Sequence, residues 1–345
     1  MGIENIQADP ERVGGRRGFE SVANRAADYR EKVSKRADVL KARYPKEVGW
    51  IEGTVHAVDF KELKSVFLEL TSKSGVAKED VNFIPPEDIF IVPPGMITTE
   101  GGSSAFLLEH NVILTSAQEM LETKKKRGEI QARQVLLYEL VHEYCHAVGA
   151  NRVQQGPLKD RTDIDVREKT AAYGKIKTFI QKHGETEQII DAAKSFILFN
   201  EGITDEIAHR VLETYLARKD FFGITASSIG DREKEGLFSF APHVSVNYRT
   251  ARTFADLLVE RISSLCEIPK DVVWNAVIAD YFRGTGLPKD LLDGIIGRGF
   301  TYNLGRSRNA MDLKDLAKHF KFPDPRPAAV ERLKSYIRGG IKLEY

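Results

Sequence analysis

Cysteine is scarce in this sequence. Only two of the 345 residues are cysteines, Cys145 and Cys266. So few thiols exclude a small scaffold held together by a framework of disulfide bonds, and they are typical of a protein from a reducing compartment.

Long apolar runs and a charge of one sign are also lacking. No apolar stretch approaches the ~20 residues that a membrane helix requires, and the first fifteen residues lack the apolar core of a secretory signal peptide. Basic and acidic residues number 51 and 50, so no net field draws the chain to nucleic acid or to anionic lipid. We therefore expect a cytoplasmic protein that binds neither nucleic acid nor membranes; export without a cleaved signal is the alternative, and the oligomeric state stays open.

Three segments of the chain differ in character. Residues 1–48 predict a polar segment and an arm helix that ends at Pro45. Residues 49–150 predict an α/β subdomain with short strands in IFIVPPGM and SAFLLEHNVILTS and a helix over about 130–148. Residues 151–345 predict a helical subdomain. Its helices are expected near 166–183, 187–199, 202–218, 247–265, 270–283 and 288–296, with one more in the tail. The expected fold class is α+β, predominantly α.

The stretch LVHEYCHAVGAN, residues 140–151, carries the clearest chemistry. Residues four apart on a helix lie about 40° apart around its axis, so His142 and His146 can both bind one metal ion, zinc above all. Glu143 lies about 100° from His142 and can act as a general base on a metal-activated water. The rest of the helix is apolar and should be buried. The alternative interpretation is a pair of hydrogen-bonded core histidines.

A third ligand would distinguish the two interpretations, because catalytic zinc sites use three protein ligands. The candidate is Glu201, in SFILFNEGITDEIAHRV, residues 195–211. Asp205 shares its helix face and can accept the second ring N–H of His142. Gly202 allows a close approach of two backbones. The rival ligand is Glu206.

HEYCH followed by FNEGITD resembles the gluzincin branch of the zincin metallopeptidases, whose pattern is H-E-x-x-H and then N-E-G or N-E-x-x-x-D. The resemblance implies one Zn²⁺ per chain, with ligands His142, His146 and Glu201. It also implies that Glu143 is the general base, that Asp205 lies behind His142, and that Asn200 matches the asparagine before the third ligand.

The same resemblance implies a zincin-like fold. A small mixed α/β part would end in the active-site helix, and the helical part after it would carry the third ligand. The gap between His146 and Glu201 is 201 − 146 − 1 = 54 residues, which is a long insertion for this family. The related metzincin pattern does not match, because Arg152 stands where a third histidine is required.

Further roles follow only from the resemblance. A downstream tyrosine or histidine would stabilise the oxyanion, and the candidates are Tyr248 and His243. Part of residues 104–114 would pair with the substrate backbone as an edge strand. We expect His209, four residues after Asp205, to be a surface or satisfied residue; the alternative is a further residue behind the metal ligands. We expect Cys145 to be a small apolar residue that points away from the metal.

These features predict a zinc-dependent metallopeptidase that hydrolyses peptide bonds of a peptide or protein substrate, with Glu143 as general base. The alternatives are a catalytically silent binding or scaffold protein with a zincin fold, and a zinc hydrolase of a non-peptide amide. The substrate, endo- or exopeptidase action and the role of the N-terminal arm stay open.

Overall fold

The computed structural model describes residues 11–12, 16–97, 104–158, 161–183, 186–225, 244–284, 289–321 and 325–338; for some of them, Tyr248 among them, only the backbone is described. The chain forms two compact units, each built from separate segments of sequence. One unit comprises residues 1–13, 149–203 and 248–345, and the other comprises 14–148 and 204–247. One boundary falls inside α6 (Ile197–Arg218), so this helix is common to both units.

The unit formed by 14–148 and 204–247 contains helices and a small sheet. Its elements are α1 (Arg16–Arg43), α2 (Pro45–His56), α3 (Phe60–Lys73), β2 (Ile89–Val92), β3 (Ser104–Leu107), β4 (Val112–Ser116), α4 (Ala117–Arg127), α5 (Glu129–Val148) and most of α6. The expected arm helix, the strands in IFIVPPGM and SAFLLEHNVILTS, and the helix over about 130–148 are confirmed.

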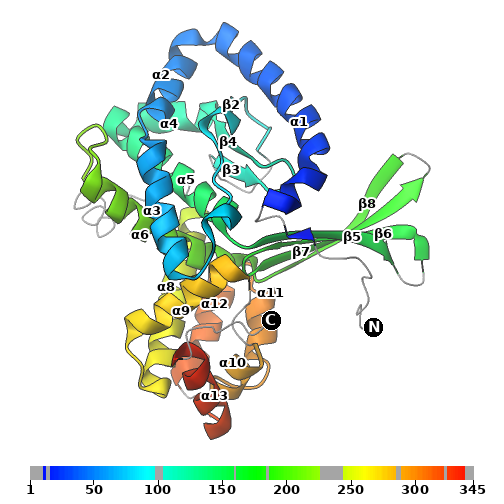
Figure 1. The fold of residues 1–345 in the computed structure, drawn as a ribbon, viewed down its shortest axis with the longest axis vertical. Helices are drawn as coiled ribbons and strands as arrows, with labels where there is room; N and C mark the ends of the chain where they lie inside the picture. Colours follow the sequence, from blue (N-terminus) through cyan, green and yellow to red (C-terminus); the bar gives the residue numbers. More distant parts are fainter. Residues whose placement is uncertain are drawn as a thin grey trace. The chain divides into compact units, whose positions relative to one another are not determined.

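The small sheet has the strand order β2-β4-β3. β4 pairs in parallel with β2 and antiparallel with β3, so β3 is an outer strand of the described sheet. Helix α1 packs against this sheet (Figure 1). Val33 of α1 is buried together with Val92, Val112 and Leu114 of the strands. The arm helix is therefore part of this unit's core.

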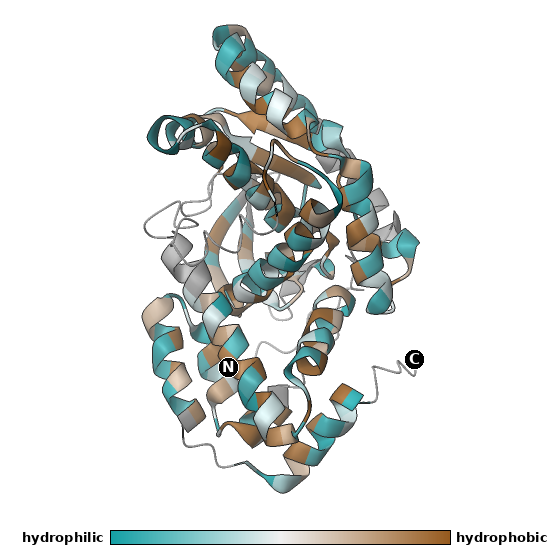
Figure 2. Ribbon diagram, turned by 90° about the vertical axis from the view of Figure 1, so that its left-hand side faces the viewer, coloured by the Kyte–Doolittle hydropathy of each residue, from teal (hydrophilic) through white to brown (hydrophobic). Residues whose placement is uncertain are grey.

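Short polar signals set where the helices begin and end. Asp59 caps α3 by accepting the backbone N–H of Glu62 at 3.0 Å, and the Ser116 side chain caps α4 by accepting the backbone N–H of Glu119. Gly75 and Gly128 follow α3 and α4 with positive φ angles of 72° and 87°, which glycine adopts at low cost. Hydrophilic and hydrophobic residues alternate along the helices (Figure 2), as expected of helices with one buried face.

The other unit contains a long antiparallel sheet and a group of helices. Its elements are β1 (Glu11–Arg12), β5 (Asn151–Leu158), β6 (Arg161–Ala171), β7 (Gly174–His183), β8 (Thr186–Ser195), the start of α6, α8 (Val244–Cys266) from Tyr248 on, α9 (Lys270–Arg283), α10 (Lys289–Ile295), α11 (Phe300–Arg306), α12 (Ala310–Ala317) and α13 (Pro327–Arg338). Its described strands follow the order β1-β5-β6-β7-β8 (Figure 1).

The helices expected near 166–183 and 187–199 are wrong, because residues 161–195 form strands β6, β7 and β8. Along β6, Val166 and Glu168 are buried whereas Arg167 and Lys169 are more exposed, which is a period of two and not of 3.6. Asp165 departs from this alternation, because it is buried next to the buried Ile164. Two residues, Ala172 and Tyr173, connect β6 to β7. Lysines and glutamates, which favour helices as isolated residues, are frequent in this segment, but the alternation in β6 and Gly174 are typical of a hairpin.

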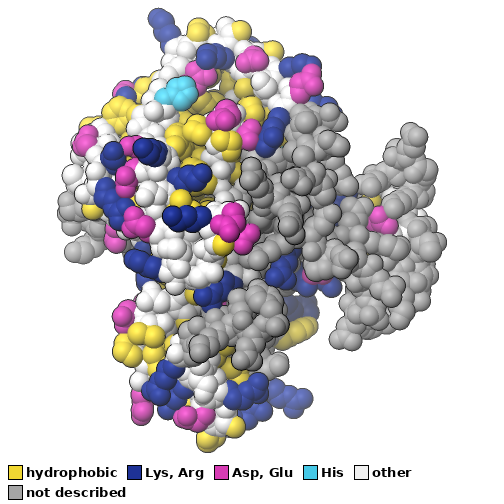
Figure 3. Space-filling model, viewed as in Figure 1, with side chains coloured by type: hydrophobic (Ala, Val, Ile, Leu, Met, Phe, Trp, Pro, Cys, Tyr) yellow, Lys and Arg dark blue, Asp and Glu magenta, His cyan; other side chains and the backbone are white. Residues whose placement is uncertain are grey.

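The later helices match the sequence better. The helices expected near 202–218, 247–265, 270–283 and 288–296 and in the tail are confirmed as α6, α8, α9, α10 and α13, whereas α11 and α12 were not expected. The described chain is therefore α+β and predominantly helical. None of its helices is long and apolar enough to cross a membrane. On the face shown in Figure 3, acidic and basic side chains of the described residues are interspersed.

Candidate metal centre

The motif helix α5 is buried on most of its circumference. Leu136, Leu140, Val141, Tyr144 and Cys145 are at most 1% exposed. On the opposite side, the Tyr144 hydroxyl donates to the Ile84 carbonyl at 2.6 Å. The helix is therefore fixed in the core as the apolar pattern predicted, and its remaining face carries the histidines.

His142, His146 and Glu201 form one group. The His142 and His146 Nε2 atoms lie 3.2 Å apart, and one ligand atom from each of the three residues lies within 4.8 Å of the others. Two ligands of a tetrahedral zinc ion with bonds of about 2.0–2.2 Å are about 3.3–3.5 Å apart. The separation of the two histidine nitrogens is close to this spacing, and the three residues together could hold a metal ion; they are the one such group among the described residues.

Two series of polar side chains at helical spacing bring this group together. In α5 they are Tyr138, His142 and His146; in α6 they are Glu201, Asp205 and His209. The Tyr138 hydroxyl donates to Asp205, and the Tyr138 and His209 rings lie 5.6 Å apart.

Because Tyr138 and His209 stand at opposite ends of the two series, the helices run antiparallel through this region. Each step of four residues forward in α5 then matches a step of four back in α6. Asp205 falls in the layer of His142, and Glu201 in the layer of His146. Sequence reasoning missed Tyr138, although its position four residues before His142 indicated it.

Glu143 faces the small sheet. Its Oε2 accepts the backbone N–H of Phe106, in the outer strand β3, at 2.6 Å. An N–H of β3 that binds a side chain of α5 points away from β4, toward the edge of β3 with which no described strand pairs. The residue predicted as general base and the strand predicted to bind substrate are therefore in direct contact.

Asn200 and Gly202 flank Glu201 and have structural partners. The Asn200 Oδ1 atom accepts the backbone N–H of Tyr173, in the β6–β7 turn, at 3.0 Å. A Cβ atom added to Gly202 would lie 2.5 Å from the carbonyl oxygen of Ala251 in α8. The close backbone approach expected at Gly202 is thus present, and its partner is α8.

Three residues near the metal group, Glu206, His209 and Cys145, are not part of it. Glu206 pairs with Arg210 at 2.9 Å and does not belong to the described metal group. His209 is 8% exposed, and its Nε2 lies 3.9 Å from Asp205 Oδ2, so it is a buried residue. Burial, with the charge of Glu143, raises the pKa of the Cys145 thiol, which therefore stays protonated and apolar as predicted.

The two oxyanion candidates stay predictions. His243 lies outside the described residues, and Tyr248 lies in α8 at a position whose side chain is not described. No distance between either side chain and the metal group follows from the structure.

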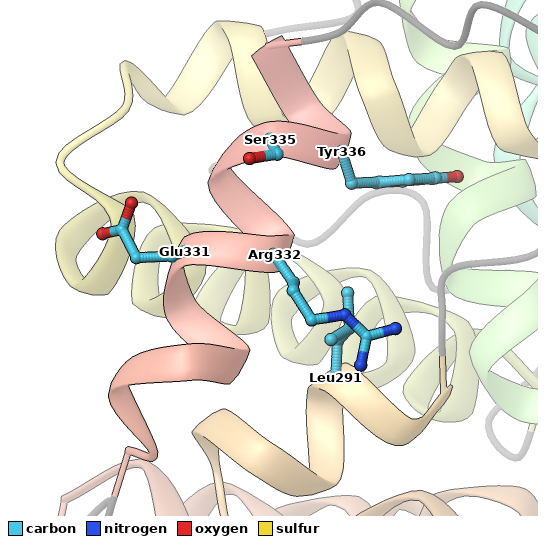
Figure 4. A pocket seen from close by; sticks show the side chains of 5 residues that line it. All are labelled: Leu291, Glu331, Arg332, Ser335 and Tyr336. Carbon is cyan, nitrogen blue, oxygen red and sulfur yellow. The ribbon is translucent and has the colours of Figure 1, made fainter.

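A shallow depression lies elsewhere, between α10 and α13 (Figure 4). It is lined by Leu291, Glu331, Arg332, Ser335 and Tyr336. All its polar lining residues come from the single helix α13, and the Tyr336 hydroxyl donates a hydrogen bond to the buried Asp280. We assign no ligand to it.

Comparisons with protein-family models, with curated protein sequences and with solved structures gave no significant match to this chain. The geometry of the His142, His146 and Glu201 group and its neighbours is therefore the basis for inferring a function.

Proposed function

We propose that this protein is a zinc-dependent metallopeptidase of the gluzincin type. The observation that carries the proposal is the convergence of His142, His146 and Glu201 beside a glutamate that contacts an outer strand. The ion would be held by two imidazole nitrogens and one carboxylate oxygen.

The donor set favours zinc and a catalytic site. Two nitrogens and one oxygen suit zinc better than they suit magnesium or calcium, which prefer oxygen ligands. Structural zinc sites have four protein ligands and commonly include cysteine. The group found among the described residues has three ligands, and the nearby Cys145 is fully buried and not among them. Three protein ligands leave one position for water or substrate.

When bound, zinc would supply Lewis-acid activation of a water molecule and of the scissile carbonyl group. Glu143 would take the proton of the attacking water and pass it to the leaving amine. Its hydrogen bond to Phe106 places this carboxylate at the open edge of β3. A substrate peptide in extended conformation could pair with that edge through its backbone, which favours a peptide over a small amide.

The arrangement of elements supports a zincin-like fold for residues 89–218. A small mixed sheet with an outer antiparallel strand precedes the motif helix, and a second helix supplies the third ligand. The long insertion between the two motifs is the strand segment β5–β8. It leaves both helices intact.

Metal content and turnover test this proposal together. We expect about one zinc ion per purified chain, lost in His146→Ala and Glu201→Ala. Glu206→Ala is the matched control, because it makes the same change five residues further along α6 at a glutamate outside the group; it should keep the metal. A parent protein that contains no zinc, even after reconstitution, would refute the proposal.

The role of Glu143 separates the peptidase from the alternatives. Glu143→Gln should keep zinc and lose peptide hydrolysis by several orders of magnitude, because the amide cannot accept the proton. Zinc binding without hydrolysis of any peptide in a diverse library would favour the silent binding or scaffold protein. Hydrolysis of non-peptide amides alone would favour the third function.

A further inference from the structure

Tyr138 is a polar residue of the α5–α6 contact to which the motif assigns no role. It lies one turn before His142, and its ring centroid is 6.1 Å from that of His142 and 5.6 Å from that of His209. Its hydroxyl donates to Asp205 Oδ1. One side chain of α5 thus contacts two residues of α6 that lie one helical turn apart, Asp205 and His209.

Asp205 needs such a partner. The residue is 4% exposed, and a buried carboxylate is costly unless donors satisfy it. A carboxylate offers about four acceptor positions, so the Tyr138 hydroxyl leaves room for an N–H of His142 in the same layer. A donor at Oδ1 also fixes the rotation of the carboxylate, and with it the direction in which its other positions point.

The same hydrogen bond joins the two helices that carry the ligands. Asp205 is one helical turn, about 5.4 Å along the axis, from Glu201. The ligand atoms of the metal group must stay within about 3.5 Å of one another once an ion is bound. A contact that fixes α6 against α5 at Asp205 therefore limits how far Glu201 can move from His146.

We propose that Tyr138 is a positioning residue of the metal centre. It acts through Asp205, by orienting that carboxylate and by fixing α6 against α5, and does not touch the metal. The inference rests on the proposed metal site and extends it to a residue outside the motif. Outer groups that orient metal ligands typically change affinity 10- to 100-fold when removed.

The decisive experiment is a mutant cycle on zinc affinity. Zinc dissociation constants are measured by competition with a chromophoric chelator for the parent, Tyr138→Phe, Asp205→Asn and the double variant. Tyr138→Phe keeps the ring beside His142 and His209 and removes only the hydroxyl. We expect it to weaken zinc binding 10- to 100-fold.

The cycle distinguishes positioning from simple packing. If Tyr138 acts through Asp205, Tyr138→Phe should change affinity less than about twofold in the Asp205→Asn background, because the two residues share one interaction. The visible absorption of the Co²⁺-substituted protein should also change in Tyr138→Phe, since it reports ligand geometry. The same loss of affinity in both backgrounds would show that the hydroxyl does not act through Asp205 and would overturn the inference.

Tyr144→Phe is the matched control. It removes a buried tyrosine hydroxyl from the same helix, one that donates to Ile84 on the side away from the histidines. It should lower thermal stability and leave zinc affinity and the Co²⁺ spectrum unchanged. If Tyr138→Phe does not fold, Asp205→Glu replaces it, because the longer side chain moves the carboxylate away from the Tyr138 hydroxyl and should weaken zinc binding similarly.

The outcomes separate the two proposals. A parent that binds neither zinc nor Co²⁺ overturns the metal site itself. A parent that binds zinc tightly, together with a Tyr138→Phe variant of equal affinity and spectrum, overturns only the role of Tyr138.

Discussion

Gly202→Ala tests the structure next to Glu201, the proposed third ligand. The new Cβ atom would lie 2.5 Å from the carbonyl oxygen and 2.6 Å from the carbonyl carbon of Ala251. Ordinary contact begins at 3.4 Å, so α6 and α8 must move apart by about 3.4 − 2.5 = 0.9 Å at this point. The obstructing atoms belong to the backbone of a helix and cannot turn aside as a flexible side chain can.

The expected magnitude follows from two opposing effects. Alanine in place of glycine favours the helix by up to about 1 kcal/mol. Overpacking of a closely packed contact costs about 1–3 kcal/mol, and a rigid obstacle places this case at the upper end. We therefore expect a net loss of about 1–2 kcal/mol in the free energy of unfolding. Zinc binding should weaken as well, because Glu201 precedes the displaced residue.

Urea denaturation measures the change in the free energy of unfolding for Gly202→Ala and for the control variant Gly53→Ala. Gly53 lies inside α2, and a Cβ atom added there meets nothing within 4 Å, so only the helix preference acts and Gly53→Ala should be stabilising by about 0.5–1 kcal/mol. A denaturation midpoint that rises in Gly202→Ala as well would contradict the close contact of α6 and α8.

Two further predictions concern pH and metal. Burial raises the pKa of Glu168, but hydrogen bonds and charges of Lys175 and Lys177 outweigh it and leave the pKa below its ordinary value. Since the folded pKa is the lower one, this stabilisation is present above the unfolded pKa of about 4.3 and is lost as pH falls through the folded pKa. Glu168→Gln should thus lower the free energy of unfolding by about 1–3 kcal/mol at pH 7 and leave it unchanged in acid below the folded pKa. Thermal unfolding between pH 7 and 3 measures this difference. A loss of stability that persists in acid would contradict the ion pairs of Glu168 as its cause. Free zinc at a hundredfold excess over its dissociation constant should stabilise the parent by about 2.7 kcal/mol and leave the melting temperature of His146→Ala unchanged.

Local signals in the sequence account for much of the fold. Asp59 and Ser116 mark the starts of α3 and α4, and Gly75 and Gly128 mark the ends. These signals act within a few residues, so they can be read without knowledge of tertiary contacts. The buried side of α5 was equally clear, because apolar residues cover most of its circumference.

The strands between the two motifs could not be predicted from the preferences of single residues. Lysine and glutamate favour helices as isolated residues, but in β6 and β7 they form cross-strand pairs, such as Glu168 with Lys177 at 3.1 Å. Such pairs stabilise a sheet only after the strands have met. Composition therefore favoured a helix, while the period of two and the glycine at residue 174 favoured the hairpin that the structure contains.

The candidate site depends on one relation that the motif alone does not specify, the register between α5 and α6. Moving α6 by one turn, about 5.4 Å, would place Asp205 opposite His146 and make it the third ligand in place of Glu201. The contacts of Tyr138 with both Asp205 and His209 exclude that shift. They lie within one compact unit, and the continuous helix α6 then carries Glu201 to the layer of His146. Two series of polar residues at a spacing of four, one of them beginning with a tyrosine, therefore favour Glu201 over Asp205 as the proposed third ligand by helix geometry, independently of any resemblance to a family.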